Sequence, residues 1–455
     1  MNKTILIIFG IFITIALLFG FINYSSISLL TFRDGILEKQ QQSLRLEQYD
    51  LLLFSRPSMP LMSGGTATKY YVKSGLTSDE VFESTKFSKA LEYALTHGKV
   101  VILRPGNYSL DSNVIINNRS NLILDGQTST LHLTNHTISF RSNHYANNTN
   151  NQIRNFIVRN GTFRLENSFR ATFENMIFED SESATEISNT NMWSEATKLE
   201  NVYWGNCKTA LTFKTPTGPA TGSYENTALD RCYFNLTLDN SVGIMVENNA
   251  EVSNSQWTNL RIWLHGKTEE TKTGLYLNGA MAETNLNGVI FESFDEGKNY
   301  GIYIGTNSTT GISVGEGTSF LGKFEARISN LNGQWIDGVV QFKESERQLN
   351  FSKSETIHRY PSTILSFNAF IKIENLSATE EVTVKIKLNF IDHTSQSITL
   401  PPFTDNTTKP YWLTNQDLYD LYPSQNVIWD IEVLAQTNLP NSQTKVTIGA
   451  YGTLR

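Results

Sequence analysis

Three carboxylates recur at one position of a repeated segment. The segment reads apolar, polar, asparagine, apolar, variable, apolar, and its second residue is Glu174, Glu200 and Asp230 in consecutive copies. If each copy is one strand of a stacked sheet, neighbouring copies lie about 4.8 Å apart and the carboxylates form a column. Such carboxylates can share a proton, bind a cation such as calcium, or act as an acid and a base. Glu174, Glu200 and Asp230 are therefore candidate cation ligands, and Glu200 and Asp230 a candidate catalytic pair.

The fifth position of the same segment carries Tyr203, Tyr233 and Arg261. On a strand this position faces outward, and two phenol rings beside a guanidinium make a platform that can stack on a sugar and pair with an acidic one. We take the three as candidate substrate-binding residues, and Arg261 as a third candidate catalytic residue. The alternative is that these outward side chains are ordinary solvated surface.

The repeat itself predicts a solenoid. Its copies start 20, 26, 30, 28 and 29 residues apart, and periods of this length are typical of stacked coils. The copies start at Ile153, Phe173, Leu199, Leu229, Trp257 and Leu286. The last residue of each copy is large and apolar, as in Phe178, Trp204 and Phe234, so we expect a column of side chains inside the coils.

Asparagine marks the bend before the final strand of each copy. It stands third in four copies and is replaced by Arg231 and Gly288 in two others. Asparagine tolerates the left-handed backbone conformation, and its amide can bond to the next asparagine in a stack. We therefore expect an asparagine ladder that is broken at Arg231 and Gly288.

Upstream of the repeat, residues 84–98 have the apolar spacing of a helix that ends near Gly98. The next segment, KVVILRPGNYSL, predicts a strand, a Pro-Gly turn and a strand, and NLILDGQTSTLHL predicts more strand. The order helix, V-V-I-L-x-P-G-x-Y and L-I-L-D-G resembles the start of the pectate-lyase-like right-handed parallel β-helix family, over roughly residues 80–335.

This resemblance implies a polysaccharide lyase, a glycoside hydrolase or a non-catalytic solenoid. The motifs of polygalacturonase-type hydrolases are absent: there is no Asp-Asp pair, and His265 lacks the preceding glycine. Arg261-Ile262 is followed by Trp263, and Asn189-Thr190 by a third polar residue, Asn191. Calcium-dependent lyases of the family use a carboxylate cluster and a basic residue, roles that only the column at Glu174, Glu200 and Asp230 with Arg261 would fill here.

The N-terminal segment predicts a membrane anchor. Residues 5–22 form an uncharged apolar run of 18, about the minimum that spans a bilayer. Lys3 before it places the N-terminus in the cytoplasm and the bulk of the chain outside. The alternative is a cleaved signal peptide, although the run is long for one and lacks a small-x-small site. We expect a cytoplasmic tip and single-pass signal anchor at residues 1–22.

Three further regions follow the anchor. Residues 23–68 are expected to form a stalk and linker; Leu37, Leu44 and Leu51 give residues 31–56 the pattern of a helix, whose heptads would also suit a homo-oligomer. Residues 69–340 are assigned to the β-helix. Residues 341–455 contain long alternating strands, which predict an antiparallel β-sandwich.

The composition restricts the partners and the kinds of site that the protein can have. A net charge of −7 without a long basic run excludes nucleic acid as a partner. The two cysteines and seven histidines show no metal-ligand spacing, and we interpret Cys207 and Cys232 as buried residues, with one disulfide as the alternative. Asn-x-Ser/Thr triplets from Asn107 to Asn406 permit glycosylation.

Together these patterns favour a mainly β, membrane-anchored cell-surface protein that binds polysaccharide or glycoprotein glycans. Two alternatives stay open. One is a lyase or hydrolase that acts on acidic glycans through Glu200, Asp230 and Arg261. The other is a non-catalytic structural or adhesive envelope protein.

Overall fold

A computed structural model describes most of the chain after residue 48. The described residues are 36, 49–57, 68–190, 194–215, 222–265, 270–293, 297–305, 308–314, 318–322, 324–329, 336–337, 339–348, 353–362, 364–390, 394–413, 428–439 and 443–454. Among them no helix is long and apolar enough to cross a bilayer. The apolar run at residues 5–22 and most of the expected stalk lie outside them.

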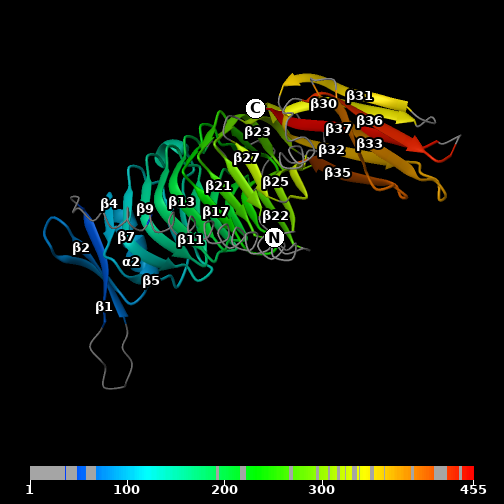
Figure 1. The fold of residues 1–455 in the computed structure, drawn as a ribbon. Coiled ribbons are helices and arrows are strands. Elements are labelled where there is room, and N and C mark those ends of the chain that lie inside the picture. The colour runs from blue at the N-terminus through cyan, green and yellow to red at the C-terminus, as the bar shows by residue number, and fades with distance from the viewer. Residues whose placement is uncertain are drawn as a thin grey trace, which may run out of the picture.

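The central part of the chain is a parallel β-helix (Figure 1). Its main sheet is closed at one end by the antiparallel strands β1 (Leu51–Pro57), β2 (Thr68–Ser74) and β3 (Glu80–Ser84), with α2 (Phe87–His97) beside them. The coils contribute to this sheet β4 (Val100–Leu103), β5 (Asn107–Ser109), β7 (Ile123–His132), β9 (Gln152–Arg159), β11 (Thr172–Glu179), β13 (Lys198–Gly205), β16 (Ala228–Asp230), β17 (Tyr233–Leu236), β20 (Gln256–Thr258), β21 (Arg261–Leu264), β24 (Ile290–Ser293) and β27 (Ser319–Gly322).

A second sheet of nine parallel strands forms another side of the coils. It consists of β6 (Val114–Asn117), β8 (Thr137–Arg141), β10 (Thr162–Glu166), β12 (Ser183–Ser188), β14 (Thr209–Lys214), β18 (Val242–Val246), β22 (Thr271–Leu277), β25 (Lys298–Ile304) and β28 (Ala326–Ser329). Further parallel strands form a third side, joined to the main sheet through β23 and β26: β15 (Gly222–Ser223), β19 (Ala250–Ser253), β23 (Ala280–Asn287), β26 (Thr309–Val314) and β29 (Ile336–Asp337). A 3-10 turn, η1 (Tyr145–Asn147), lies in one of the connections.

The strand register confirms the alignment of the repeats. Phe173, Leu199 and Leu229 pair in succession, and so do Phe178, Trp204 and Phe234. The rings of Trp204 and Phe234 stack with centroids 4.5 Å apart and planes 7° apart. These side chains are fully buried, so the expected interior column is confirmed. Each coil shields the rings of its neighbours from water, which no single coil can do alone.

The asparagine ladder is also confirmed. Asn155, Asn175 and Asn201 all have φ between 51° and 63°. The Asn201 amide donates to the Asn175 side-chain carbonyl at 3.2 Å, and the Asn175 amide to that of Asn155 at 3.3 Å. Arg231 and Gly288 adopt the same left-handed conformation at their places in the row. Arg231 therefore interrupts the side-chain ladder without changing the bend of the backbone.

The N-terminal cap corrects one prediction. The helix expected over residues 31–56 is wrong at its end, because Leu51–Pro57 forms β1. This strand pairs antiparallel with β2 and parallel with β4, and buries Leu51 and Leu53 in the core. These pairings with distant residues outweigh the local helical spacing of the leucines.

The helix expected near residue 90 is confirmed as α2. Gly98 follows it in an extended conformation, with φ at −92°. A Cβ there would lie 2.9 Å from Val101 Cγ2 and 3.0 Å from Leu51 Cδ1. Close packing of β1 and β4 against the end of α2, rather than a left-handed turn, therefore requires the glycine.

The C-terminal part consists of two four-stranded sheets whose pairings are antiparallel (Figure 1). One contains β30 (Val339–Gln348), β37 (Lys445–Leu454), β32 (Ile364–Glu374) and β35 (Thr407–Leu413). The other contains β31 (Lys353–Ser362), β36 (Ile428–Thr437), β33 (Val382–Phe390) and β34 (Ser395–Thr399). Antiparallel pairing of long strands is what the sequence predicted for this region.

The ladder yields a stability prediction. We expect Asn201→Ala to lower the free energy of unfolding by about 1–3 kcal/mol, since it leaves the Asn175 carbonyl without its donor and puts alanine, which tolerates the left-handed conformation less well than asparagine, at the bend. Asn201→Gly loses the same hydrogen bond without the backbone cost, so its loss should be smaller by about 1 kcal/mol. Urea unfolding of the full chain, followed by tryptophan fluorescence, measures both. Equal losses would show that the left-handed bend contributes nothing.

Candidate functional site

The main sheet brings the three carboxylates into one column. Glu174 pairs with Glu200 in the register of β11 and β13, and Glu200 with Asp230 in that of β13 and β16. The column continues into Arg154 on one side and Thr258 on the other. The carboxylate column that the sequence predicted is therefore present in the fold.

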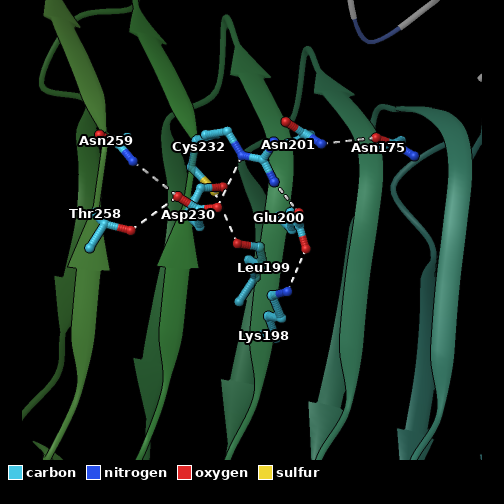
Figure 2. Close-up of polar contacts among 10 residues, drawn as sticks. Asn175, Lys198, Leu199, Glu200, Asn201, Asp230, Cys232, Thr258 and Asn259 are labelled. Carbon is cyan, nitrogen blue, oxygen red and sulfur yellow. Dashed lines mark hydrogen bonds and ion pairs between the residues drawn. The ribbon is translucent and has the colours of Figure 1, made fainter. Parts of the chain in front are cut away.

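Basic side chains neutralise the column (Figure 2). Arg231 Nε lies 3.0 Å from Asp230 Oδ2, and the same guanidinium contacts Glu200. Lys198 Nζ lies 2.5 Å from the other oxygen of Glu200. At the opposite end, Arg154 Nε donates to Asp125 at 2.9 Å. Basic side chains beside the row, or at its end, thus offset the repulsion between acids that lie one strand spacing apart.

Asp230 is held in its ionised form. Burial favours the neutral acid, but hydrogen bonds from Asn259 and Thr258 and the bond and charge of Arg231 outweigh it, so the pKa of Asp230 is lowered. Thr258 Oγ1 and Asn259 Nδ2 donate to Asp230 Oδ1 at 3.0 and 3.3 Å (Figure 2). A carboxyl with a lowered pKa is a poor proton donor at neutral pH, which argues against a general-acid role.

The column also offers no cation site of the expected kind. Within the described part of the chain, no three His, Cys, Asp or Glu side chains converge so as to hold a metal ion. Arg231 bridges Glu200 and Asp230, where a calcium ion would need to bind. The expected ligand set of Glu174, Glu200 and Asp230 is therefore not assembled.

Arg261 belongs to a different ion pair. Its Nη2 and Nε lie 2.8 and 2.9 Å from Glu292 Oε2 on β24. Burial raises the pKa of Glu292, and the charge and hydrogen bond of Arg261 oppose that shift. The guanidinium is directed to the following coil, so the structure does not bring Arg261 together with Glu200 and Asp230 as one catalytic group.

The expected open platform at Tyr203 and Tyr233 is wrong. Both rings face away from the interior and stack on one another with centroids 5.9 Å apart, yet only 4% and 2% of these residues are exposed. Ile36, Ile177 and Trp263 pack around them in a separate apolar cluster. Because the N-terminal residue Ile36 covers the rings, a sugar cannot stack on them in this arrangement.

The two cysteines are buried and free, which confirms the first interpretation of them. Burial raises the pKa of both thiols to about 12. Cys232 Sγ donates to the Leu199 carbonyl beneath the carboxylate column (Figure 2). These thiols are therefore packing residues without nucleophilic character.

An open pocket lies on the second sheet, where the sequence motifs had given no candidate residue. It has a volume of about 370 Å³ and spans β18, β22 and β25. Its lining comprises Asn240, Ser241, Val242, Met245, Thr271, Thr273, Tyr276, Tyr300 and Tyr303. Aromatic faces beside hydroxyl and amide groups are typical of sites that bind small polar ligands.

Three tyrosines form an aromatic corner in this pocket. The rings of Tyr276 and Tyr303 meet at 63° with centroids 5.4 Å apart, and those of Tyr300 and Tyr303 at 83° and 5.3 Å. All three rings are half-buried. Burial is the main cause that raises the pKa of Tyr300, with Glu325 and Tyr303 adding to it, so this hydroxyl remains a donor.

A glycine column shapes the pocket. Met245, Tyr276 and Tyr303 are aligned across the sheet, and so are Val242, Thr273 and Tyr300. Between the two rows lie Gly243, Gly274 and Gly301. A Cβ on Gly274 would lie 2.7 Å from the buried Phe291 ring, and the next residue, Leu275, is also buried. Each of the three strands thus has two consecutive buried positions, and the residues on both sides of this pair line the pocket.

The pocket contains one buried hydroxyl with spare bonding capacity. Ser241 is 1% exposed, and its Oγ forms no hydrogen bond with any described residue. Buried polar groups are usually paired, and an unpaired one costs about 1–3 kcal/mol. A ligand hydroxyl or a water in the pocket would satisfy it.

The sequence did contain a signal for this pocket. Tyr276 follows Gly274 by two residues, and Tyr303 follows Gly301 by two, 27 residues apart. This spacing of 27 residues equals the length of one coil, and it repeats along the second sheet as the asparagine segment does along the main sheet. The repeat was aligned only on its asparagine segment, so the second periodic pattern was missed.

The ion pairs of Asp230 give a pH prediction. Because its pKa is lowered in the folded state, Asp230 stabilises the protein above its ordinary pKa of 3.8, and this contribution is lost as the pH falls through the lowered value. Wild type should therefore exceed Asp230→Asn in unfolding free energy at pH 6, and the gap should close below about pH 4. Urea titrations at several pH values measure it; a gap constant down to pH 2 would contradict the ionised assignment.

Comparison with known proteins does not place the chain in a family. No family model matches it, and no curated protein does. Among solved structures, it is similar to a tailspike protein 4 domain of bacteriophage CBA120 (TM-score 0.26, 10% identity, 78% of this chain and 64% of that one). It is similar to the A-module of mannuronan C-5 epimerase AlgE4 of Azotobacter vinelandii (0.21, 12%, 52% and 88%) and to a chain of the IBDV particle (0.19, 12%, 26% and 31%). The chain spans less than two thirds of the tailspike domain and of the IBDV chain, and at these TM-scores the likenesses decide neither fold nor function.

Proposed function

We propose that the protein binds neutral sugar residues of a polysaccharide in the tyrosine-lined pocket of the second sheet. The observation that supports this most directly is the aromatic corner of Tyr276, Tyr300 and Tyr303 beside hydroxyl and amide side chains. The apolar face of a pyranose ring packs on an aromatic face, while its hydroxyls need donors and acceptors at the edge. The pocket supplies both within one hollow.

The charge of the pocket favours neutral sugars over uronates. None of its nine lining residues is charged. A carboxylate that entered would lose water without gaining a cationic partner in the lining, which is costly. Just outside the lining, the negative charge of Glu325 contributes to the raised pKa of Tyr300. The exposed Lys298 is the strand partner of Thr271, one of the lining residues. Charges of both signs therefore lie near the pocket and leave no net attraction for an acidic sugar. This differs from the acidic glycans that the sequence alternative assumed.

The lyase or hydrolase alternative depended on Glu200, Asp230 and Arg261. The first two share Arg231, and the third is bound to Glu292. An acid and a base for glycan cleavage need environments that separate their pKa values and a space between them for substrate. The column is instead filled by ion pairs, so binding rather than cleavage is the function that the geometry supports.

We also propose that residues 5–22 anchor the protein in a membrane and that the β-helix lies on the far side. Their uncharged apolar length and the preceding Lys3 support this. Glycan binding and a surface location fit each other, since the pocket would then face extracellular polysaccharide.

Binding should depend on the tyrosine corner. In the full chain, purified in detergent, Tyr276→Ala should weaken binding of a neutral oligosaccharide about tenfold, or about 1.4 kcal/mol, because one wall of the stacking site is lost. Calorimetry against neutral and uronate polymers measures this. The matched control is Tyr71→Ala, a half-buried tyrosine on β2 that also stacks on a neighbouring ring. The proposal fails if no neutral polymer binds, or if both variants behave alike.

Anchoring can be tested separately. We expect the wild-type chain to stay in the membrane fraction after alkaline carbonate extraction. We also expect its C-terminus to be protected from a protease that is added on the cytoplasmic side of the membrane. Ile13→Arg with Leu17→Arg should release it, since each arginine near the centre of a span costs about 2.5–3.5 kcal/mol. Ile115→Arg, at an exposed site on β6, is the control and should remain bound. Complete extraction of the wild-type chain would contradict the anchor.

A further inference from the structure

A lysine side chain lies in the interior of the coils. Lys272 stands near the start of β22, and its side chain is 0% exposed. Among the described residues its ammonium has one partner, Glu270 Oε2, at 3.3 Å. A lysine ammonium carries three N–H donors, and a buried charge that is incompletely paired is costly. Packing alone therefore does not account for a lysine at this position.

The strand partner of Lys272 is an equally buried asparagine. Asn299 on β25 pairs with Lys272, is 0% exposed, and follows it by 27 residues, the length of one coil. Side chains of paired residues in a parallel sheet point to the same side, and their strands lie about 4.8 Å apart. The fold therefore places an amine and a carboxamide next to one another, shielded from water.

The carboxamide of Asn299 is hydrogen-bonded only through its nitrogen. Its Nδ2 donates to Ser293 Oγ at 2.8 Å, and Ser293 is fully buried as well. Its Oδ1 is buried and has no hydrogen-bond partner among the described residues. Buried acceptors without a partner are uncommon in folded proteins. The unpaired atom is the oxygen on which negative charge develops if the carbon of the amide is attacked.

Glu270 supplies a group that can carry protons. It stands two residues before Lys272, and its carboxylate contacts the ammonium, while 24% of its side chain is exposed. On the other side of Lys272 the neighbouring coil has Ser241, because the next residue along, Val242, pairs with Thr273. Serine offers only a hydroxyl, so Asn299 is the electrophile in this row.

An ordinary buried ion pair is the alternative explanation of Lys272. It accounts for the contact with Glu270, but it leaves two donors of the ammonium and the Asn299 oxygen without partners among the described residues. A covalent bond between the amine and the carboxamide would use both groups. It would also replace a buried ammonium by a neutral amide, which removes the cost of the buried charge.

We infer that Lys272 and Asn299 form an intramolecular amide cross-link, with Glu270 as the proton carrier. Rotation about the side-chain torsions of Lys272 turns Nζ from Glu270 toward Asn299 Cγ. Glu270 takes one proton from the ammonium, which frees the lone pair of Nζ for attack on Cγ. The carboxyl group formed on Glu270 then donates a hydrogen bond to Oδ1, where negative charge develops.

The reaction is completed by loss of the amide nitrogen. The bond between Cγ and Nδ2 breaks as the carbonyl re-forms. A second proton of Nζ and the proton held by Glu270 pass to the departing nitrogen, which leaves as ammonium. Glu270 is thereby returned to its carboxylate, and the new amide keeps one hydrogen on Nζ. No oxidant, metal or further reactant is needed.

The cross-link would join two coils beside the tyrosine-lined pocket. Thr271 and Thr273, on either side of Lys272, line that pocket, and so does Tyr300, which follows Asn299. A covalent bond between β22 and β25 would hold these walls at a fixed spacing. The cross-link does not require sugar binding, so it stands independently of the proposed function.

Peptide mapping of the wild-type chain tests the cross-link directly. The full chain is purified in detergent, denatured, and digested with an endoprotease that cleaves after glutamate. Lys272 then lies in the peptide of residues 271–283 and Asn299 in that of residues 297–316. We expect tandem mass spectrometry to find these two peptides joined, with a mass one ammonia below their sum. Two separate peptides at their full masses, or a join at Lys298 in place of Lys272, would overturn the proposal.

Three variants locate the chemistry. Lys272→Met removes the amine, and Glu270→Gln removes the proton carrier but keeps both reacting groups, so each should give separate peptides. Lys298→Met removes the exposed lysine next to Asn299 and is the matched control, which should keep the joined peptide. A join that persists in Lys272→Met, or is lost equally in Lys298→Met, would contradict the assignment. If Lys272→Met does not fold, the wild-type map still decides, because it requires no variant.

Discussion

The structure depends on one constraint, the in-register stacking of parallel coils at a single strand spacing. Each coil bonds through its backbone to the coils on either side, and every side chain therefore meets its counterpart in the neighbouring coil. Inside, this makes columns of apolar rings such as Trp204 and Phe234. At the bend it makes the asparagine ladder. On the outside it brings like groups together whether or not they attract.

The carboxylate column shows how the chain accommodates like charges that the stacking places next to one another. Glu200 and Asp230 are forced into adjacent positions, and the residue at the next bend is Arg231, where the ladder would otherwise have asparagine. Arg231 keeps the left-handed backbone, and its guanidinium bridges both acids. Arginine in place of asparagine at this position of the ladder thus offsets the repulsion between two carboxylates that the register places side by side. The break in the asparagine repeat at Arg231 therefore has a physical cause, namely the two acids beside it.

The features that the sequence predicted well are those that repeat. The interior column, the asparagine bend and the alignment of Glu174, Glu200 and Asp230 all follow from a period, and a period is visible in one chain. What it missed depends on contacts between distant segments. Leu51 was expected in a helix because of its spacing from Leu37 and Leu44, whereas its strand partners, Ser74 and Val101, lie far along the chain. Tyr203 and Tyr233 were expected to be exposed, because nothing in the sequence around them predicts their contact with Ile36. The pocket was missed because its walls come from three coils and its shape from a row of glycines.

The unequal lengths of the coils have a consequence for how such a chain can change over generations. Successive copies differ from 20 to 30 residues, yet their strands stay in register, so the connections between strands absorb every difference. Insertions and deletions are therefore tolerated at those connections, or as complete coils, but not within a strand. A duplicated coil would lengthen the tyrosine rows and the acid–base column by one rung each. Natural variants of this protein should accordingly differ in reach by whole coils while the chemistry of each rung is kept.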